Sequence, residues 1–460
     1  MIVMKFGGTS LQDAAAITQA ATIVAAKQDR APAVVVSAMA GVTDALIRIS
    51  LLSRERRFED AASIIEELRQ RHLKTARELL GEAARQSFSE ITQAIEHDLK
   101  ELEGLARSVA TLGELTPRTQ DAIVSFGERL SSPIVAGALN ARGVAAQLVD
   151  SRAFIITDDR FTNATPDFPQ IEARTRETLL PILEARVVPV AQGFIGSTTE
   201  GVTTTIGRGG SDYSAALIGA ALGAETIEIW TDVDGLMTAD PRVVKNALRI
   251  RVISFAEASE LSYFGAKVLH PSTVLPAVER GIPVNIYNTR NPDCEGTQIV
   301  ASPRPSDNVI KSIAFKRGVT IVNVASTRML MAHGFLRTIF EVFDRHHTSV
   351  DVVTTSEVSV SMTLDNADQL EAIARDLSGI GDVSVERGKA IVCVVGDNLK
   401  FKSGVASRLF HAIKDTNVNM ISQGASEINL TFVIDDSDCE QAVRALHDEF
   451  FSEAEANTFA

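Results

Sequence analysis

Short apolar runs that end in small or polar residues recur along the first 300 residues. The runs at 1–4 and 33–36 are each followed by glycine or other small residues and then by a helical stretch. Similar runs follow at 147–149, 186–191, 228–230 and 283–287. This alternation is typical of a mostly parallel sheet with helices on both faces. We therefore predict an α/β domain over residues 1–300, with its ligands beyond the carboxyl ends of the strands.

A different pattern interrupts this alternation between residues 51 and 108. The segment is rich in Glu, Arg, Leu and Ala, and its only glycines are Gly81 and Gly104. We expect it to be wholly helical, as an insertion or lid or simply as a packing scaffold.

The pattern changes again after residue 300. Proline-containing turns at 291–296 and 302–307 mark the expected boundary. Residues 312–388 then read as strand, helix, strand, strand, helix and strand, which is the order of a ferredoxin-like α+β unit. Residues 389–460 repeat this order without a clear final strand. We predict two such units in tandem, able to share strands.

Composition narrows the class of protein. A chain of 460 residues exceeds one ordinary core. Its formal net charge of -14 argues against binding to nucleic acid or to an acidic membrane, although not against a nucleotide. The 3 cysteines are far apart, which predicts neither a disulfide framework nor a structural zinc site. No apolar run is long enough to span a membrane, and the N-terminus reads as a strand, so we expect a cytoplasmic protein.

The glycine-rich stretch 207–212 is the first candidate site. It precedes an apolar helix predicted at 213–222, whose N-terminus favours an anion. The planar guanidinium of Arg208 can hold a carboxylate or phosphate through two bonds, and Ser211 or Asp212 can cap the helix. Taken alone, the stretch is equally compatible with a plain turn and a solvated Arg208.

Lys5 is the second candidate, because an apolar run precedes it and Phe6-Gly7-Gly8 follows it. Phosphoryl transfer needs positive charge and a glycine-rich backbone around the phosphates. Ser37 and Thr43 should reach the same crevice from the next strand. The sequence contains neither a P-loop motif nor a Gly-x-Gly-x-x-Gly motif after a strand.

Two acidic residues complete the predicted chemistry. Asp212 could orient Lys5 and a second lysine, Lys267, which also stands beside a glycine-containing loop. Glu128 lies in an apolar helix beside a glycine, so it could bind an ammonium group in the crevice. The alternative for Glu128 is a solvated face of that helix.

Six motifs together resemble an aspartate kinase of the amino acid kinase family. They stand at 5–10, 36–43, 125–128, 203–212, 230–235 and 264–271. The resemblance continues into paired C-terminal ACT-type regulatory units and therefore covers nearly the whole chain. It is nearest to the monofunctional, lysine-inhibited form of the family.

The resemblance implies roles for individual residues. The catalytic residues would be Lys5, Asp212 and Lys267. Aspartate would be bound by Thr43, Glu128, Arg208, Gly209, Gly210 and Ser211, with Arg208 on its α-carboxylate and Glu128 on its ammonium. The nucleotide would be bound by Lys5, Phe6, Gly7, Gly8, Ser37, Thr231, Asp232, Met237, Arg242, Lys267 and Val268. Met237 stands where the family usually has a tyrosine.

The expected reaction transfers the γ-phosphoryl group of ATP to the β-carboxylate of L-aspartate, the first step towards lysine, threonine and methionine. The Mg²⁺ ion would be held mainly by the ATP phosphates, without a dedicated protein metal site. A carboxylate nucleophile needs no general base at neutral pH. Two alternatives stay open: a sister kinase acting on glutamate or a carbamate, and a catalytically silent amino-acid sensor.

A regulatory site for L-lysine is predicted in the first ACT-type unit. Its expected residues are Met329, Gly334, Phe335, Leu336, Val350, Asp351, Thr355, Ser356 and Glu357. A helix start would receive the α-carboxylate, and Asp351 and Glu357 would match two ammonium groups, which favours lysine over threonine. The alternative is that both acids only close a turn and pair with arginines. We expect the units to pair between two chains, giving a homodimer or larger oligomer.

Overall fold

The computed structural model describes the chain in six segments. They are residues 1–81, 85–265, 271–302, 309–329, 333–452 and 458–460. Contacts divide the chain into two compact units: Met1–Leu236 with Val268–Ser302, and Met237–Lys267 with Pro303–Ala460. Segment 237–267 thus packs with the C-terminal residues, whereas the sequence pattern had assigned it to the domain spanning 1–300.

The first unit is built on a mostly parallel sheet, which confirms the predicted fold class. Its strands lie in the order β3-β4-β2-β1-β7-β9-β10. They are β1 (Ile2–Phe6), β2 (Pro32–Val36), β3 (Ala146–Val149), β4 (Val188–Gln192), β7 (Thr226–Thr231), β9 (Val284–Asn288) and β10 (Thr297–Val300). All neighbours are parallel except β9 and β10. Strand β1 is central and buried on both faces, as its unbroken apolar run requires.

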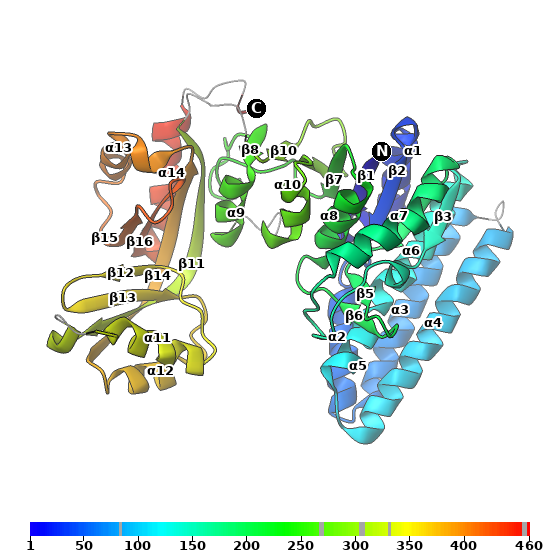
Figure 1. Cartoon of the computed structure of the whole chain (residues 1–460), viewed down its shortest axis with the longest axis horizontal. Coiled ribbons are helices and arrows are strands. Elements are labelled where there is room, and N and C mark those ends of the chain that lie inside the picture. Colours follow the sequence, from blue (N-terminus) through cyan, green and yellow to red (C-terminus); the bar gives the residue numbers. More distant parts are fainter. Residues whose placement is uncertain (82–84, 266–270, 303–308, 330–332, 453–457) are drawn as a thin grey trace. The chain divides into compact units, whose positions relative to one another are not determined.

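Helices cover both faces of this sheet (Figure 1). They are α1 (Ala14–Ala25), α2 (Val42–Arg54), α3 (Phe58–Leu80), α4 (Arg85–Leu112), α5 (Pro117–Val124), α6 (Phe126–Ala141), α7 (Phe168–Glu184), α8 (Gly210–Leu222) and α10 (Leu275–Glu279). Helices α1 and α6 share a core with Ile2, Met4 and Phe6 of β1. Helix α8 lies against the other face, where a Cβ at Gly219 would come within 2.6 Å of Ile227.

The described residues of the predicted helical segment 51–108 form the end of α2 followed by α3 and α4, with non-helical residues at 55–57 and 81. The two long helices lie side by side (Figure 1). A short hairpin of β5 (Ile195–Ser197) and β6 (Thr203–Thr205) leads into α8. No helix among the described residues is long and apolar enough to cross a membrane.

The second unit contains one antiparallel sheet in the order β12-β13-β11-β14-β16-β15. Its strands are β11 (Ile310–Ala325), β12 (Val353–Thr355), β13 (Ser359–Leu364), β14 (Asp382–Gly396), β15 (Val418–Gln423) and β16 (Asn429–Asp435). Its helices include α9 (Phe255–Tyr263), α11 (Phe335–Arg345), α12 (Leu370–Leu377), α13 (Val405–Ala412) and α14 (Cys439–Phe451). Both predicted ferredoxin-like units are therefore present, joined in a single sheet.

The two long strands β11 and β14 serve both halves of this sheet. Residues 319–325 of β11 pair with β13 and with the start of β14. Residues 310–317 pair instead with 390–396 of β14, which in turn pairs with β16. The second ferredoxin-like unit therefore takes its final strand, which its own residues do not provide, from residues 310–317 at the start of β11.

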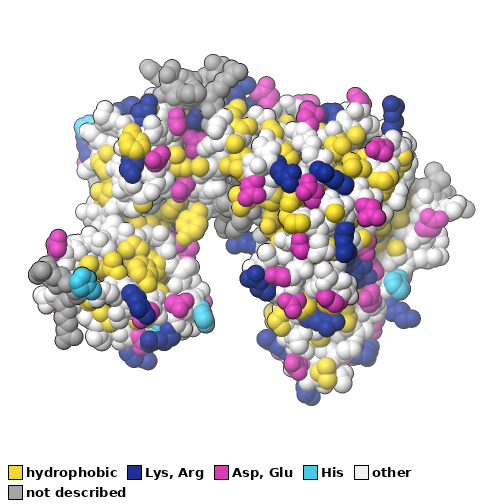
Figure 2. Space-filling view, in the orientation of Figure 1, with side chains coloured by type: hydrophobic (Ala, Val, Ile, Leu, Met, Phe, Trp, Pro, Cys, Tyr) yellow, Lys and Arg dark blue, Asp and Glu magenta, His cyan; other side chains and the backbone are white. Residues whose placement is uncertain are grey.

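Charged side chains of both signs are interspersed over the face shown in Figure 2. The visible surface carries no single extended basic patch, in keeping with the formal net charge of -14.

Candidate active site

A cavity of about 550 Å³ lies where β1 and β2 end, at the edge predicted for ligand binding. Ten of the predicted site residues line it: Lys5, Gly8, Ser37, Thr43, Glu128, Arg208, Gly209, Gly210, Ser211 and Asp212. The structure therefore brings together segments from the start, the middle and the end of the first 212 residues.

Lys5 is the next-to-last residue of β1 and is only 8% exposed. Its Nζ atom lies 2.6 Å from Oδ1 of Asp212, in the first turn of α8. Gly8 is needed nearby, because a Cβ there would lie 3.0 Å from the carbonyl oxygen of Ala38. The predicted pairing of Lys5 with Asp212 is confirmed, and it holds the ammonium at the cavity wall.

Helix α8 begins differently from the prediction. Its N-cap is Gly209, in the left-handed region at φ 73°, and no side chain caps it. Ser211 and Asp212 lie inside the first turn, so the predicted cap by either side chain is wrong. A glycine adopts this φ at no steric cost and lets the chain turn sharply into the helix. Asp212 is thereby left free to face Lys5.

Arg208 lies on this loop and lines the cavity. Its side chain is exposed, and no ion pair joins it to another residue in the described part of the chain. An uncompensated guanidinium beside a helix N-terminus is a suitable site for a carboxylate.

Glu128 is 3% exposed, so the alternative of a solvated helix face is wrong. Its Oε1 atom accepts a hydrogen bond of 3.1 Å from the N–H of Ala38. Its Oε2 atom is buried and has no hydrogen-bond partner among the residues described. Burial raises the pKa of Glu128 to about 8, while the Ala38 N–H and the charge of Lys5 oppose the rise. A positively charged ligand group would find an unfilled acceptor here.

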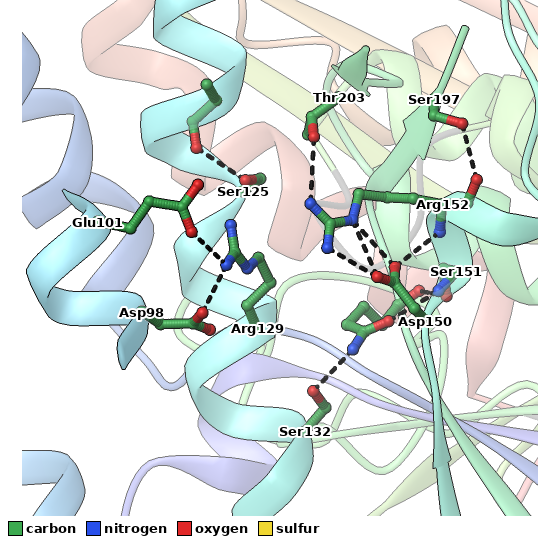
Figure 3. Close-up of polar contacts among 12 residues, drawn as sticks. Asp98, Glu101, Ser125, Arg129, Ser132, Asp150, Ser151, Arg152, Ser197 and Thr203 are labelled. Atoms are coloured by element: carbon green, nitrogen blue, oxygen red, sulfur yellow. Dashed lines mark hydrogen bonds and ion pairs between the residues drawn. The ribbon is translucent and has the colours of Figure 1, made fainter. Parts of the chain in front are cut away.

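Arg129, the residue after Glu128, anchors helix α6 to helix α4 (Figure 3). Arg129 does not line the cavity, and it pairs with Asp98 at 2.5 Å and Glu101 at 2.8 Å, both on α4. Its guanidinium also lies 4.2 Å from the ring centroid of Phe126. These contacts fix the rotation of α6 and hence the direction of Glu128.

The predicted nucleotide residues are more scattered. Thr231 and Asp232, at the end of β7, line a second cavity of about 360 Å³. Phe6 is fully buried and stacks on Trp230 with ring centroids 6.1 Å apart, so its side chain belongs to the core. The N–H of Gly7 donates to the carbonyl of Trp230.

The remaining nucleotide residues lie in other parts of the chain. Met237 and Arg242 belong to the second unit. The Met237 carbonyl accepts a bond from Ser312, and Arg242 pairs with Asp240 at 2.6 Å. Lys267 and Val268 lie outside the described residues.

The helix start predicted for the lysine site is present in the structure. Gly334 is the N-cap of α11 at φ 80°, and Phe335 and Leu336 open the helix. Met329 packs against the hydrophobic core of this half of the sheet. Val350 is half-buried, whereas Thr355, Ser356 and Glu357 are exposed.

Asp351 has partners that the sequence did not predict. The hydroxyl of Tyr263 donates to its Oδ1 atom at 2.5 Å, and Nζ of Lys316 lies 3.7 Å from its Oδ2 atom. Burial raises the pKa of Asp351 to about 6, helped by a hydrogen bond to Asp365. Among the described residues, Asp351 therefore contacts a tyrosine and a lysine rather than the arginines named in the structural alternative.

Sequence reasoning also missed several residues that line the main cavity. They are Asp121, Thr162, Phe194 and Thr205. One signal was available, since Asp121 precedes Glu128 by seven residues in a helical run and this spacing places both side chains on one face.

These features define the class of protein: an α/β domain with a glycine-rich loop and a buried acid in one cavity, joined to paired ferredoxin-like units. Residues 1–288 match the amino acid kinase family, and residues 392–450 match an ACT domain. Lysine-sensitive aspartokinase 3 of Escherichia coli is 39% identical and aligns over 98% of this chain and 99% of its own length. Chloroplastic aspartokinase 1 of Arabidopsis thaliana is also 39% identical, over 98% of this chain and 80% of its own.

Solved structures agree with this relationship. E. coli aspartokinase III in complex with aspartate and ADP (R-state) matches with a TM-score of 0.82, covering 98% of this chain and 100% of that one. The same enzyme in complex with lysine and aspartate (T-state) matches with a TM-score of 0.84, covering 98% and 99%. The chain therefore belongs to the amino acid kinase family and, within it, to the aspartokinases.

Proposed function

We propose that the chain is an aspartate kinase that phosphorylates the β-carboxylate of L-aspartate with ATP and is inhibited by L-lysine. One observation carries the proposal: a single cavity is lined by Arg208, Glu128 and the Lys5–Asp212 pair. These groups complement the α-carboxylate, the ammonium and the migrating phosphoryl group of such a reaction. The related E. coli enzyme binds aspartate and ADP, which supports the same assignment.

Arg208 would hold the α-carboxylate through two parallel bonds, with the backbone of Gly209, Gly210 and Ser211 at the start of α8 adding positive potential. Glu128 would accept the ammonium at its Oε2 atom, which has no hydrogen-bond partner among the described residues. Thr43 would close the pocket. Because the pKa of Glu128 is raised to about 8, aspartate would bind at neutral pH with release of a proton from this side chain.

In the chemical step, an oxygen of the β-carboxylate would form a bond to the γ-phosphorus while the bond to the bridging oxygen of ADP breaks. The products are 4-phospho-L-aspartate and ADP, and no proton has to be removed from the nucleophile. Lys5 would stabilise the charge on the equatorial oxygens, and Asp212 would hold its ammonium in position. Mg²⁺ carried by the ATP phosphates would supply further charge neutralisation, and Lys267 would assist on the nucleotide side.

The rest of the nucleotide site is proposed from the family motifs. It would comprise Phe6, Gly7, Gly8, Ser37, Thr231, Asp232, Met237, Arg242 and Val268. Met237 provides no aromatic ring where the family usually has a tyrosine, so we expect weaker stacking with adenine.

For regulation, lysine would place its α-carboxylate at the start of α11 and its ammonium groups on Asp351 and Glu357. Asp351 is already bonded to Tyr263 and lies near Lys316, so the incoming ammonium has to compete with both. We also propose a cytoplasmic location and a dimer formed through the ACT units.

A coupled assay tests this proposal. ADP production should require aspartate, and hydroxylamine should trap the acyl phosphate product as a hydroxamate. Glutamate and buffer alone serve as controls, and addition of lysine should lower the rate. Equal turnover with glutamate would favour the sister kinase, and no turnover with any substrate would favour the silent sensor.

A further inference from the structure

We propose that Asp121, on α5, is a positioning residue for the aspartate pocket. Its buried carboxylate ties β6, the strand leading to Arg208, to the loop formed by residues 158–165. This inference rests on the proposed aspartate site and adds to it the element that sets the shape of one wall.

Three hydrogen bonds converge on this carboxylate. Asp121 is 1% exposed. Its Oδ2 atom accepts from the N–H of Thr205 and from the N–H of Thr162, each at 2.9 Å. Its Oδ1 atom accepts from the hydroxyl of Thr205 at 2.7 Å. One side chain therefore joins segments 41 and 84 residues away in the sequence.

The loop that it holds is strained at the point of attachment. Thr162 has a φ of 73°, in the left-handed region that β-branched residues rarely adopt. Such backbone strain persists only where surrounding contacts fix it, and it is concentrated at functional sites. The bond from the Thr162 N–H to Asp121 is such a contact, and Thr162 lines the cavity.

The loop and the strand also contact each other directly. The N–H of Ala164 donates to the carbonyl of Thr205 at 2.9 Å. A Cβ at Gly207 would lie 2.4 Å from Oδ1 of Asn163, so the loop packs closely against the residue before Arg208. Asp121 thus fixes the part of the cavity wall that carries Arg208, the residue proposed to bind the α-carboxylate.

An ionised Asp121 satisfies all three contacts. Two partners are backbone N–H groups, which only donate, and the third is a hydroxyl, which can donate or accept. Asparagine is nearly the same size, but it loses the negative charge that strengthens the two N–H bonds, and the Thr205 hydroxyl would have to turn and accept from its NH₂. We therefore expect Asp121→Asn to loosen the wall without opening a cavity in the core.

The matched control is Asp159→Asn in the same loop. The Asp159 side chain is exposed and makes no hydrogen bond or ion pair in the part of the chain that the structure describes. This variant changes the same acid to the same amide but leaves the bonds within the loop and the link to β6 intact.

The experiment measures kcat and the KM values for aspartate and ATP, with thermal unfolding as the check on folding. For Asp121→Asn we expect the KM for aspartate to rise on the order of tenfold or more, with the KM for ATP within about twofold of wild type. The preference for aspartate over glutamate should fall, because the wall of the pocket would no longer be held in a single position. Asp159→Asn should match the wild type in each quantity.

A second pair of variants decides the question if Asp121→Asn does not fold. Thr205→Val removes only the hydroxyl donor, and Thr205→Ser keeps it. The valine variant should show the same selective rise in the KM for aspartate, and the serine variant should restore it. An unchanged KM for aspartate, or equal changes in both KM values, would overturn the role of Asp121. A wild-type enzyme without activity on aspartate would instead overturn the proposed function.

Discussion

Lys5 is a nearly buried ammonium that faces both a carboxylate and the main cavity. We expect Lys5→Ala to lower kcat by about 10²-fold or more, with a smaller change in the KM for aspartate, because Lys5 would act on charge that develops in the transition state. Steady-state kinetics check this, with Lys74→Ala as control, since that lysine side chain is 76% exposed on α3. A folded Lys5→Ala enzyme with normal kcat would refute the assignment.

Glu128 should make the free energy of unfolding depend on pH. Its pKa in the folded chain, about 8, lies above the ordinary value of 4.5. The folded state therefore binds a proton that the unfolded state has lost, and the free energy of unfolding should fall as pH rises from about 4.5 to about 8. Glu128→Gln should remove this slope.

Denaturant unfolding at pH 5.5 and pH 8.5 measures the effect, and Glu67→Gln on the exposed face of α3 is the control. The same proton affects ligand binding, since the proposed ammonium contact needs the carboxylate. The KM for aspartate should fall between pH 6 and 8 in the wild type and be high and flat in Glu128→Gln. A parallel pH profile in both proteins would contradict this role.

The candidate site residues that could be predicted from the sequence are those marked by their immediate neighbours in the chain. The glycines around Lys5 and Arg208 indicated close backbone approach, and the structure brings Lys5 to Asp212 across 207 positions. Asp121 was missed because its importance depends on partners at 162 and 205, far from it in the chain. The cap predicted at α8 was wrong because Gly209 is the N-cap, which leaves Asp212 inside the first turn, where it faces Lys5.

Among the elements, β11 and β14 are the strands whose length and pairing partners could not be predicted from the sequence pattern. The sequence indicated the 319–324 and 391–395 runs as separate strands. In the structure they belong to strands of 16 and 15 residues, nearly three times as long, whose pairing is interrupted by register shifts near Arg317 and Val319. Period-two alternation identifies a strand, but the choice of partner is non-local and cannot be seen in one stretch of chain. The sharing of strands was foreseen only as an option.

Helix α9 is fastened to the regulatory sheet at several points. Tyr263 bonds to Asp351, Glu260 accepts from Asn429 at 2.7 Å, and a Cβ at Gly265 would lie 2.4 Å from the carbonyl of Phe315. The α9 segment leads directly to the Phe-Gly-Ala-Lys motif at 264–267. A ligand that takes Asp351 from Tyr263 would therefore loosen a contact of the segment that carries a predicted catalytic lysine.

Tyr263→Phe isolates this contact, because it removes only the donor to Asp351. The effector ammonium would then have one competitor fewer, so the lysine concentration for half-inhibition should fall several-fold. Ser262→Ala is the control, since the Ser262 hydroxyl bonds only within α9, to Ala258. Inhibition curves for both variants decide the matter, and an unchanged or higher half-inhibitory concentration for Tyr263→Phe would exclude competition at Asp351.

For the whole molecule, inhibition requires lysine to favour one arrangement of the chain over another, since a ligand with equal affinity for both shifts nothing. In the described residues of the regulatory sheet, β12 and β15 are the outer strands. Edge strands present unpaired backbone groups, which favours their burial by a second copy. Two copies would provide two linked lysine sites, so we expect inhibition to be sigmoidal.

Asp351→Asn tests the proposed lysine site without breaking the hydrogen bond between residue 351 and Tyr263. The amide oxygen can still accept the Tyr263 hydroxyl, while the negative charge for an ammonium is lost. We expect lysine inhibition to weaken at least about tenfold, with uninhibited turnover retained, and Glu357→Gln to weaken it less because Glu357 is exposed. Asp344→Asn, an exposed acid on α11, is the control. If saturating lysine leaves the wild-type rate unchanged, or if threonine alone inhibits, the effector site lies elsewhere and Asp351 serves only to hold Tyr263.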